Sequence, residues 1–200
     1  VDIQGVLLIA DGIAGVRRVF PSAQIWLHRA DEPLYANVAS QARVYGIALE
    51  SPPPTDRDWH EGDQVSLGAH TFRVVHLAGH SPGHVALVGE RDVFVGDVVF
   101  AGSIGRTDLP LSDPAAMQES LARVKEWPGH LILHPGHGPA TTVADEVSTN
   151  PFLVGIARPR SGGAARVRAS APLLRRRSVA SETKWTRTVR RDGTGHAHLH

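Results

Sequence analysis

The sequence contains no cysteine among its 200 residues. This absence excludes a disulfide framework, a thiolate metal site and a cysteine nucleophile. No apolar run approaches the roughly 20 residues that a membrane-spanning helix needs, and residues 1–10 lack the pattern of a secretory signal. We therefore expect a cytoplasmic protein that does not contact membranes. The chain begins with Val1 rather than methionine, which indicates an incomplete N-terminus.

Charge is distributed unevenly along a chain of otherwise ordinary composition. The hydrophobic fraction of 42% and the charged fraction of 20% exclude wholesale disorder. Up to Leu153 there are 10 lysines and arginines against 18 aspartates and glutamates, and beyond it 11 against 2. This split predicts an acidic folded domain over residues 1–153 and a basic, disordered tail over residues 154–200. Such a tail either contacts nucleic acid without sequence specificity or is a solvated extension.

Strand-like and helix-like patterns alternate along the acidic domain. Short apolar runs predict strands at 5–9, 25–27, 64–67, 71–76, 85–88, 93–95 and 131–133. One helix is predicted to begin with Asp31 as its N-cap and to end at Gly46, and another to begin at Asp113 and end at Gly129. Because the strands occur both as hairpins and between helices, the pattern indicates a layered α/β or α+β domain.

Three polar clusters each follow a predicted strand. The turn LAGHSPGH carries His80 and His84, Asp97 follows the strand 93–95, and the turn HPGHGP carries His134 and His137. Taken singly, each histidine could be a surface group, and Asp97 could cap a turn. Taken together, histidines and an aspartate at three strand ends predict a divalent metal site for zinc, iron or manganese. His137 lies between glycines and is favoured as a ligand over His134, which fits the end of its strand.

A glycine-rich loop with one arginine follows Asp97. The loop runs over residues 101–108 and carries Arg106. An arginine in such a loop can bind an anionic group of a substrate. The alternative is a structural ion pair between Arg106 and Asp108.

The order of these motifs resembles that of the metallo-β-lactamase fold hydrolases. HSPGH is followed by GD, then by SIGRTDLP and HPGHGP, and finally by TNPF at residues 149–152. The branch that it resembles most comprises the small hydroxyacylglutathione hydrolase-like (glyoxalase II-like) proteins. The resemblance extends from about Gly5 to Leu153.

The resemblance implies an α+β fold, the αββα sandwich of this family, with a metal site at the edge of the sheets. It implies that His80 and His137 each bind one of two metal ions and that Asp97 bridges both. It also implies a small acyl or thioester substrate, with Arg106 on the substrate side. Zinc is the expected metal, with iron and manganese as alternatives.

One family motif is absent. The family carries HxHxDH after its first apolar strand, and a gapless count places these positions at Ala10, Gly12, Ala14 and Gly15. None of these side chains can bind a metal. We therefore expect at most one weakly held ion and reduced or lost activity. The alternatives are a truncated or frameshifted relic without catalysis, and a non-enzymatic binding module that uses the basic tail.

Overall fold

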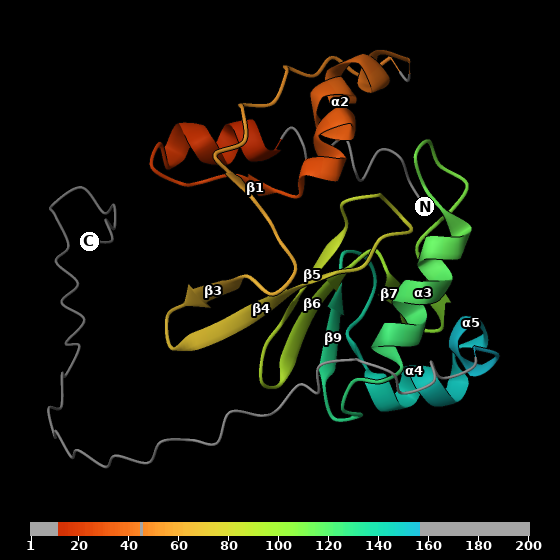
Figure 1. The fold of residues 1–200 in the computed structure, drawn as a ribbon. Coiled ribbons are helices and arrows are strands. Elements are labelled where there is room, and N and C mark those ends of the chain that lie inside the picture. The colour runs from red at the N-terminus through yellow and green to blue at the C-terminus, as the bar shows by residue number, and fades with distance from the viewer. Residues whose placement is uncertain (1–11, 45, 157–200) are drawn as a thin grey trace, which may run out of the picture. The chain divides into compact units, whose positions relative to one another are not determined.

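The computed structural model describes residues 12–44 and 46–156. Its main feature is a six-stranded sheet in the order β10-β9-β6-β5-β4-β3 (Figure 1). These strands are β3 (Gln64–Leu67), β4 (His70–His76), β5 (Val85–Val88), β6 (Asp92–Gly96), β9 (Ile132–Pro135) and β10 (Thr141–Thr142). The neighbours pair antiparallel except β6 and β9, which are parallel.

The remaining elements are helices and two small sheets. Residues 12–19 are helical. Strand β1 (Trp26–Leu27) pairs with β2 (Arg57–Asp58), and β7 (Val99–Phe100) pairs with β8 (Ser103–Ile104). The other helices are η1 (Arg29–Asp31), α2 (Glu32–Val44), α3 (Pro114–Val124), α4 (Val143–Thr149) and α5 (Pro151–Val154). No helix in the described part of the chain is long and apolar enough to cross a membrane.

Most of the predicted elements within the described residues are confirmed. The β3–β4 hairpin turns at Gly68, whose φ of 60° favours glycine. The Asp113 side chain accepts hydrogen bonds from the backbone N–H groups of Ala115 and Ala116 and so caps α3. This helix ends at Val124, earlier than the predicted end at Gly129. The predicted strand 5–9 and the predicted tail, except its first three residues, lie outside the described residues.

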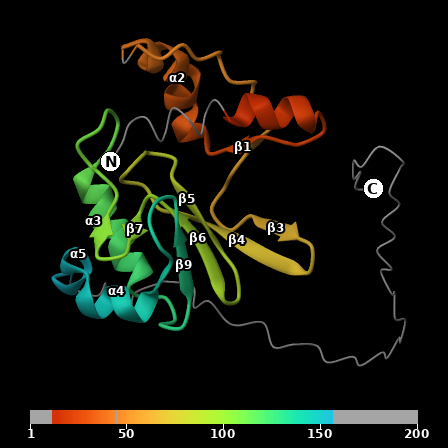
Figure 2. The same ribbon diagram turned by 180° about the vertical axis from the view of Figure 1, so that it is seen from behind.

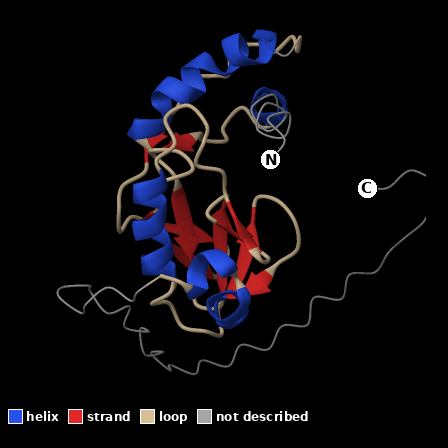
Figure 3. Cartoon of the chain, turned by 90° about the vertical axis from the view of Figure 1, so that its right-hand side faces the viewer, coloured by secondary structure: helices blue, strands red, loops and turns tan. Residues whose placement is uncertain are grey.

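Three helices cover one face of the large sheet. The α3 side chains Met117, Leu121 and Val124 are fully buried. They belong to one apolar cluster with sheet residues, among them Val93 and Leu133, and with side chains of α4 and α5. Figure 3 shows these helices beside the strands. Burial of this continuous apolar cluster is the main stabilising term of the domain.

The opposite face of the sheet is apolar but less covered. The strand register places Phe94 and His134 opposite each other, on the face away from Val93 and Leu133. Phe94 is 46% exposed, and its ring centroid lies 5.4 Å from that of Phe72. Within residues 12–44 and 46–156 the other two sheets have two strands each. The described residues therefore supply one large sheet of the expected sandwich and the helices on one of its faces.

The sheet topology brings three strand ends to the same edge. Strand β4 runs antiparallel to β5, β5 antiparallel to β6, and β6 parallel to β9. Strands β4, β6 and β9 therefore point in the same direction, as Figures 1 and 2 show from opposite sides. The segments that follow these three strands carry the three polar clusters of the sequence.

A buried polar network ties α4 and α5 to the β7–β8 hairpin. The Glu146 carboxylate is 3% exposed and accepts hydrogen bonds from Thr141 Oγ1, the Gly102 N–H and Asn150 Nδ2. Asn150 is fully buried and also donates to the Ser103 carbonyl, at 2.9 Å. Buried polar groups need such partners, because an unpaired group keeps its full desolvation cost.

We predict that Asn150→Ala lowers the free energy of unfolding by about 2–3 kcal/mol, because the Glu146 carboxylate and the hairpin carbonyl both lose a buried donor. Urea unfolding followed by circular dichroism measures this change. Ser148→Ala on the exposed side of α4 is the control and is expected to change stability by less than about 0.5 kcal/mol. Equal losses in the two variants would contradict the assigned role of the network.

Candidate functional site

His80, Asp97 and His137 meet at the edge where β4, β6 and β9 end. The distance from His80 Nε2 to Asp97 Oδ2 is 3.6 Å, and that from His137 Nδ1 to Asp97 Oδ1 is 3.0 Å. The His80 and Asp97 side chains are 11% and 14% exposed, whereas that of His137 is 36% exposed. The structure therefore brings together the three side chains predicted to form the site, with the Asp97 carboxylate between the two imidazoles.

The His80 ring is oriented by the loop that follows β8. Its Nδ1 lies 3.0 Å from the backbone carbonyl of Arg106. Because a carbonyl only accepts, Nδ1 carries the ring proton and donates it. In the neutral ring, Nε2 then keeps its lone pair on the side of Asp97, which is the orientation that a metal-binding imidazole needs.

The glycine-rich turn after β9 allows His137 to approach Asp97. A Cβ atom at Gly136 would overlap Asp97 Oδ1, so a larger residue cannot occupy this position without displacing the carboxylate. Gly138 has a φ of 78°, in the left-handed region that favours glycine. The glycines on both sides of His137 are therefore required by a close contact and by a turn.

The backbone of Asp97 is held by His84, which belongs to the first polar cluster but is not among the ligands that the resemblance implies. The Asp97 N–H donates to His84 Nε2 at 3.0 Å. The ring also lies against Gly96, where a Cβ atom would be 2.6 Å from Nε2. Burial lowers the pKa of His84 from 6.5 to about 4, with a further contribution from His80. His84 is therefore neutral near pH 7 and acts as a hydrogen-bond acceptor.

The Asp31 carboxylate binds the loop that carries His80, although the position of Asp31 in the sequence predicts a helix N-cap. Its carboxylate accepts hydrogen bonds from Ser81 Oγ at 2.7 Å and from the Gly83 N–H at 2.6 Å. The helical turn η1 is capped instead by His28, whose Nδ1 accepts from the Ala30 N–H. The prediction of an N-cap at Asp31 is thus wrong, because the carboxylate bonds a loop 50 residues away in sequence.

A pair of stacked histidines supports the same loop. The rings of His28 and His76 are 4.4 Å apart and inclined by 11°. His76 Nε2 donates to the Pro82 carbonyl at 2.7 Å. Burial, and then the neighbouring His76, lower the pKa of His28. The segment around residues 28–31 therefore contacts the His80 loop directly through the Asp31 carboxylate, and its His28 ring packs on His76, which bonds the same loop.

Arg106 forms an ion pair with Asp108, which was the alternative to a substrate contact. Its Nε and one terminal nitrogen each lie 2.7 Å from a carboxylate oxygen of Asp108. The hydrogen bond to the guanidinium lowers the pKa of Asp108 to about 2. His134 lies in β9, as predicted, and contacts Asp92 at 2.8 Å. Binding of substrate by Arg106 stays a prediction.

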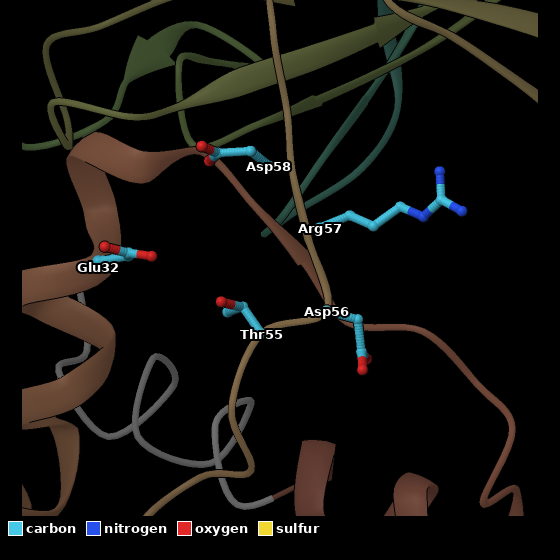
Figure 4. A pocket seen from close by; sticks show the side chains of 5 residues that line it. All are labelled: Glu32, Thr55, Asp56, Arg57 and Asp58. Carbon is cyan, nitrogen blue, oxygen red and sulfur yellow. The ribbon is translucent and has the colours of Figure 1, made fainter.

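A shallow pocket elsewhere in the described residues has no connection with these side chains. It is lined by Glu32, Thr55, Asp56, Arg57 and Asp58 (Figure 4). In Figure 4 the Arg57 side chain extends away from Glu32 and Thr55. Asp56 is paired with Arg17 at 2.7 Å. The carboxylates of this pocket are thus not joined by the Arg57 guanidinium. Its lining residues form no convergent set of catalytic groups.

The described residues do not fit the two-metal centre that the family resemblance implies. Among them, no group of three or more histidine, aspartate or glutamate side chains is arranged to hold a metal ion. The imidazoles of His80 and His137 face the Asp97 carboxylate rather than a common point beyond it. Residues 12–19 form a helix, and its Gly12, Ala14 and Gly15 have no donor side chain.

We predict that Asp31→Ala loosens the His80 loop, because the Ser81 hydroxyl and the Gly83 N–H lose their acceptor. Amide hydrogen exchange at Gly83 should accelerate at least about tenfold, since a hydrogen bond to a charged group contributes about 1.5–3 kcal/mol. Glu32→Ala removes the neighbouring exposed carboxylate and is the matched control. If Asp31→Ala left the protection of the Gly83 amide against exchange unchanged, the role of Asp31 in holding this loop would be refuted.

The lowered pKa of His84 predicts acid sensitivity. The unfolded chain takes up a proton near pH 6.5, whereas the folded chain resists it until about pH 4. The contribution of neutral His84 to the free energy of unfolding is therefore fully present above pH 6.5. It decreases by about 3 kcal/mol as the pH falls towards 4. Urea unfolding across this pH range tests the slope. In His84→Gln the free energy of unfolding should decrease less over this pH range. An identical decrease would show that other groups cause the acid sensitivity.

Sequence comparison identifies relatives over the same part of the chain. A family model of the metallo-beta-lactamase superfamily matches residues 12–137. The hydroxyacylglutathione hydrolase GloC of Haemophilus influenzae is 35% identical over 136 residues, which cover 65% of this chain and 64% of GloC. The probable metallo-hydrolase YqgX of Bacillus subtilis is 38% identical over 66% of this chain and 64% of its own length. The chain thus spans less than two thirds of these relatives.

Structure comparison gives the same family. TTHA1623, solved in a di-iron-bound form, matches with a TM-score of 0.65 and 42% identity, over 72% of this chain and 71% of its own. The BLEG-1 B3 metallo-beta-lactamase matches with a TM-score of 0.65 and 33% identity over the same shares. Since the family model, the relatives and the fold agree, this chain belongs to the metallo-β-lactamase superfamily.

Proposed function

We propose that this chain is a hydrolase of thioester type, acting on substrates such as hydroxyacylglutathione, whose activity is reduced or lost. The observation that carries the proposal is the shared Asp97 carboxylate, which lies between His80 and His137 at one edge of the sheet. Similarity to the hydroxyacylglutathione hydrolase GloC supports the substrate class. The substrate is then a small acyl compound with a thiol leaving group.

The reduced activity follows from the donors that the chain lacks. Proteins of this superfamily bind metal ions, and the neighbour TTHA1623 is di-iron-bound. No histidine occurs before His28 in this sequence, so the first family motif contributes no imidazole. Two imidazoles and one carboxylate are too few donors for two ions. We propose that zinc, iron or manganese binds here at most once and weakly.

The residues present divide into those that hold the Asp97 carboxylate and those that hold the loops around it. His80 and His137 contact the carboxylate, while Asp31 and the Arg106 carbonyl fix the His80 loop and ring. This support uses hydrogen bonds among protein groups. We therefore propose that the site edge stays ordered even where catalysis is weak.

The first test measures metal content and thioester hydrolysis side by side with GloC. Purified protein should retain less than one equivalent of zinc, iron or manganese, and it should hydrolyse S-lactoylglutathione at least about a hundredfold more slowly than GloC. His80→Ala, Asp97→Ala and His137→Ala should each abolish whatever metal binding remains. Hydrolysis as fast as that of GloC would overturn the proposed reduction.

The second test restores the missing donors. The variant Ala10→His/Gly12→His/Ala14→Asp/Gly15→His places HxHxDH at the positions of the gapless count. It should hydrolyse S-lactoylglutathione at least about tenfold faster than the unmodified chain, and adding Asp97→Ala should remove this gain. A gain with a β-lactam but not with the thioester would overturn the substrate class. No gain with either would favour the relic without catalysis over a hydrolase of reduced activity.

A further inference from the structure

We propose that His84 is a positioning residue for Asp97 and that it acts as a fixed tautomer, with its proton on Nδ1 and its Nε2 lone pair accepting the Asp97 N–H. The contact is 3.0 Å long. A backbone N–H can only donate, so the opposing ring nitrogen must carry a lone pair. A neutral imidazole has one N–H, which is then on Nδ1.

Within the described part of the chain, the other ring nitrogen of His84, Nδ1, is left without a hydrogen-bond partner in this arrangement. His84 Nδ1 is shielded from solvent and has no hydrogen-bond partner in the described structure. A buried N–H without a partner keeps its desolvation cost without the gain of a hydrogen bond. The opposite tautomer would place its Nε2 proton against the Asp97 N–H, so that two donors would face each other at 3.0 Å. The ring therefore leaves Nδ1 unpaired in order to accept from Asp97.

The close packing at Gly96 makes the contact directional. Gly96 has a φ of 53°, and a Cβ atom there would lie 2.6 Å from His84 Nε2. The ring edge thus occupies the space that a side chain would take, directly before Asp97 in the chain. Strand β6 ends at Gly96, so this is where the backbone leaves the sheet ladder and needs another acceptor.

The bond to His84 also determines where the carboxylate points. The side chain of Asp97 lies between His80 and His137, at 3.6 Å and 3.0 Å. A rotation of the Asp97 backbone would move both carboxylate oxygens away from these rings. His84 bonds the main-chain N–H of Asp97, so its influence on the carboxylate passes through the main chain of Asp97.

This inference does not rest on the proposed hydrolysis. Its readouts need neither a metal nor a substrate, so the two proposals fail separately. In the first experiment, long-range ¹⁵N–¹H correlation spectra of the full chain at pH 7 assign the His84 tautomer. The expected pattern is a protonated Nδ1 and an unprotonated Nε2. A proton on Nε2 would overturn the proposal, whatever the behaviour of any variant.

The second experiment compares two substitutions of similar length. In His84→Gln the side-chain oxygen can take the place of Nε2 as acceptor, whereas the thioether in His84→Met is a weak acceptor. Exchange of the Asp97 amide should accelerate at least about tenfold in His84→Met and less than about threefold in His84→Gln. The ¹⁵N shifts of the His137 ring should move in His84→Met and stay in place in His84→Gln.

A merely structural role predicts a different result. If His84 only filled space, both variants would change the Asp97 amide and the His137 ring alike, and that outcome would overturn the proposal. His130→Met, at an exposed histidine, is the control for loss of an imidazole. If neither variant folds, the tautomer measured in the unmodified chain decides.

Discussion

One aspartate organises the edge of this domain. Asp97 is bonded on its main chain to His84 and lies with its carboxylate between His80 and His137. These histidines come from the segments after β4 and β9, while Asp97 follows β6, and the sheet aligns all three strand ends. A change of register between β6 and β9 would separate Asp97 from His137. The pairing of Phe94 with His134 is therefore as important to the site as the residues themselves.

Local features of the fold could be predicted from local sequence. The turn of the first hairpin follows from Gly68, and the start of α3 follows from Asp113 and Pro114. The strands β4, β5 and β6 follow from short apolar runs between glycine turns. The candidate site residues could also be predicted, because each lies directly after such a run, and the resemblance to a family selected among the histidines.

The support of the site could not be predicted in this way. Asp31 bonds Ser81 across 50 residues, and its position before a helix fits an N-cap equally well. His84 and His80 lie four positions apart in the same turn, and only the folded loop shows that one faces the carboxylate of Asp97 and the other its N–H. Neither role leaves a periodicity or a spacing in the sequence. Where an aspartate directly precedes a helix, only the structure shows whether its carboxylate caps that helix or bonds a distant loop.

The supporting contacts explain why a chain without the first family motif can keep the geometry of the remaining loops. Among the described residues, Asp97 and the His80 loop form hydrogen bonds with Asp31, His76, His84 and the Arg106 carbonyl. The Glu146–Asn150 network does the same for the β7–β8 hairpin. None of these groups is a histidine or aspartate of the absent motif. Folding of this edge therefore depends on donors and acceptors within the domain, separately from the chemistry that we propose for it.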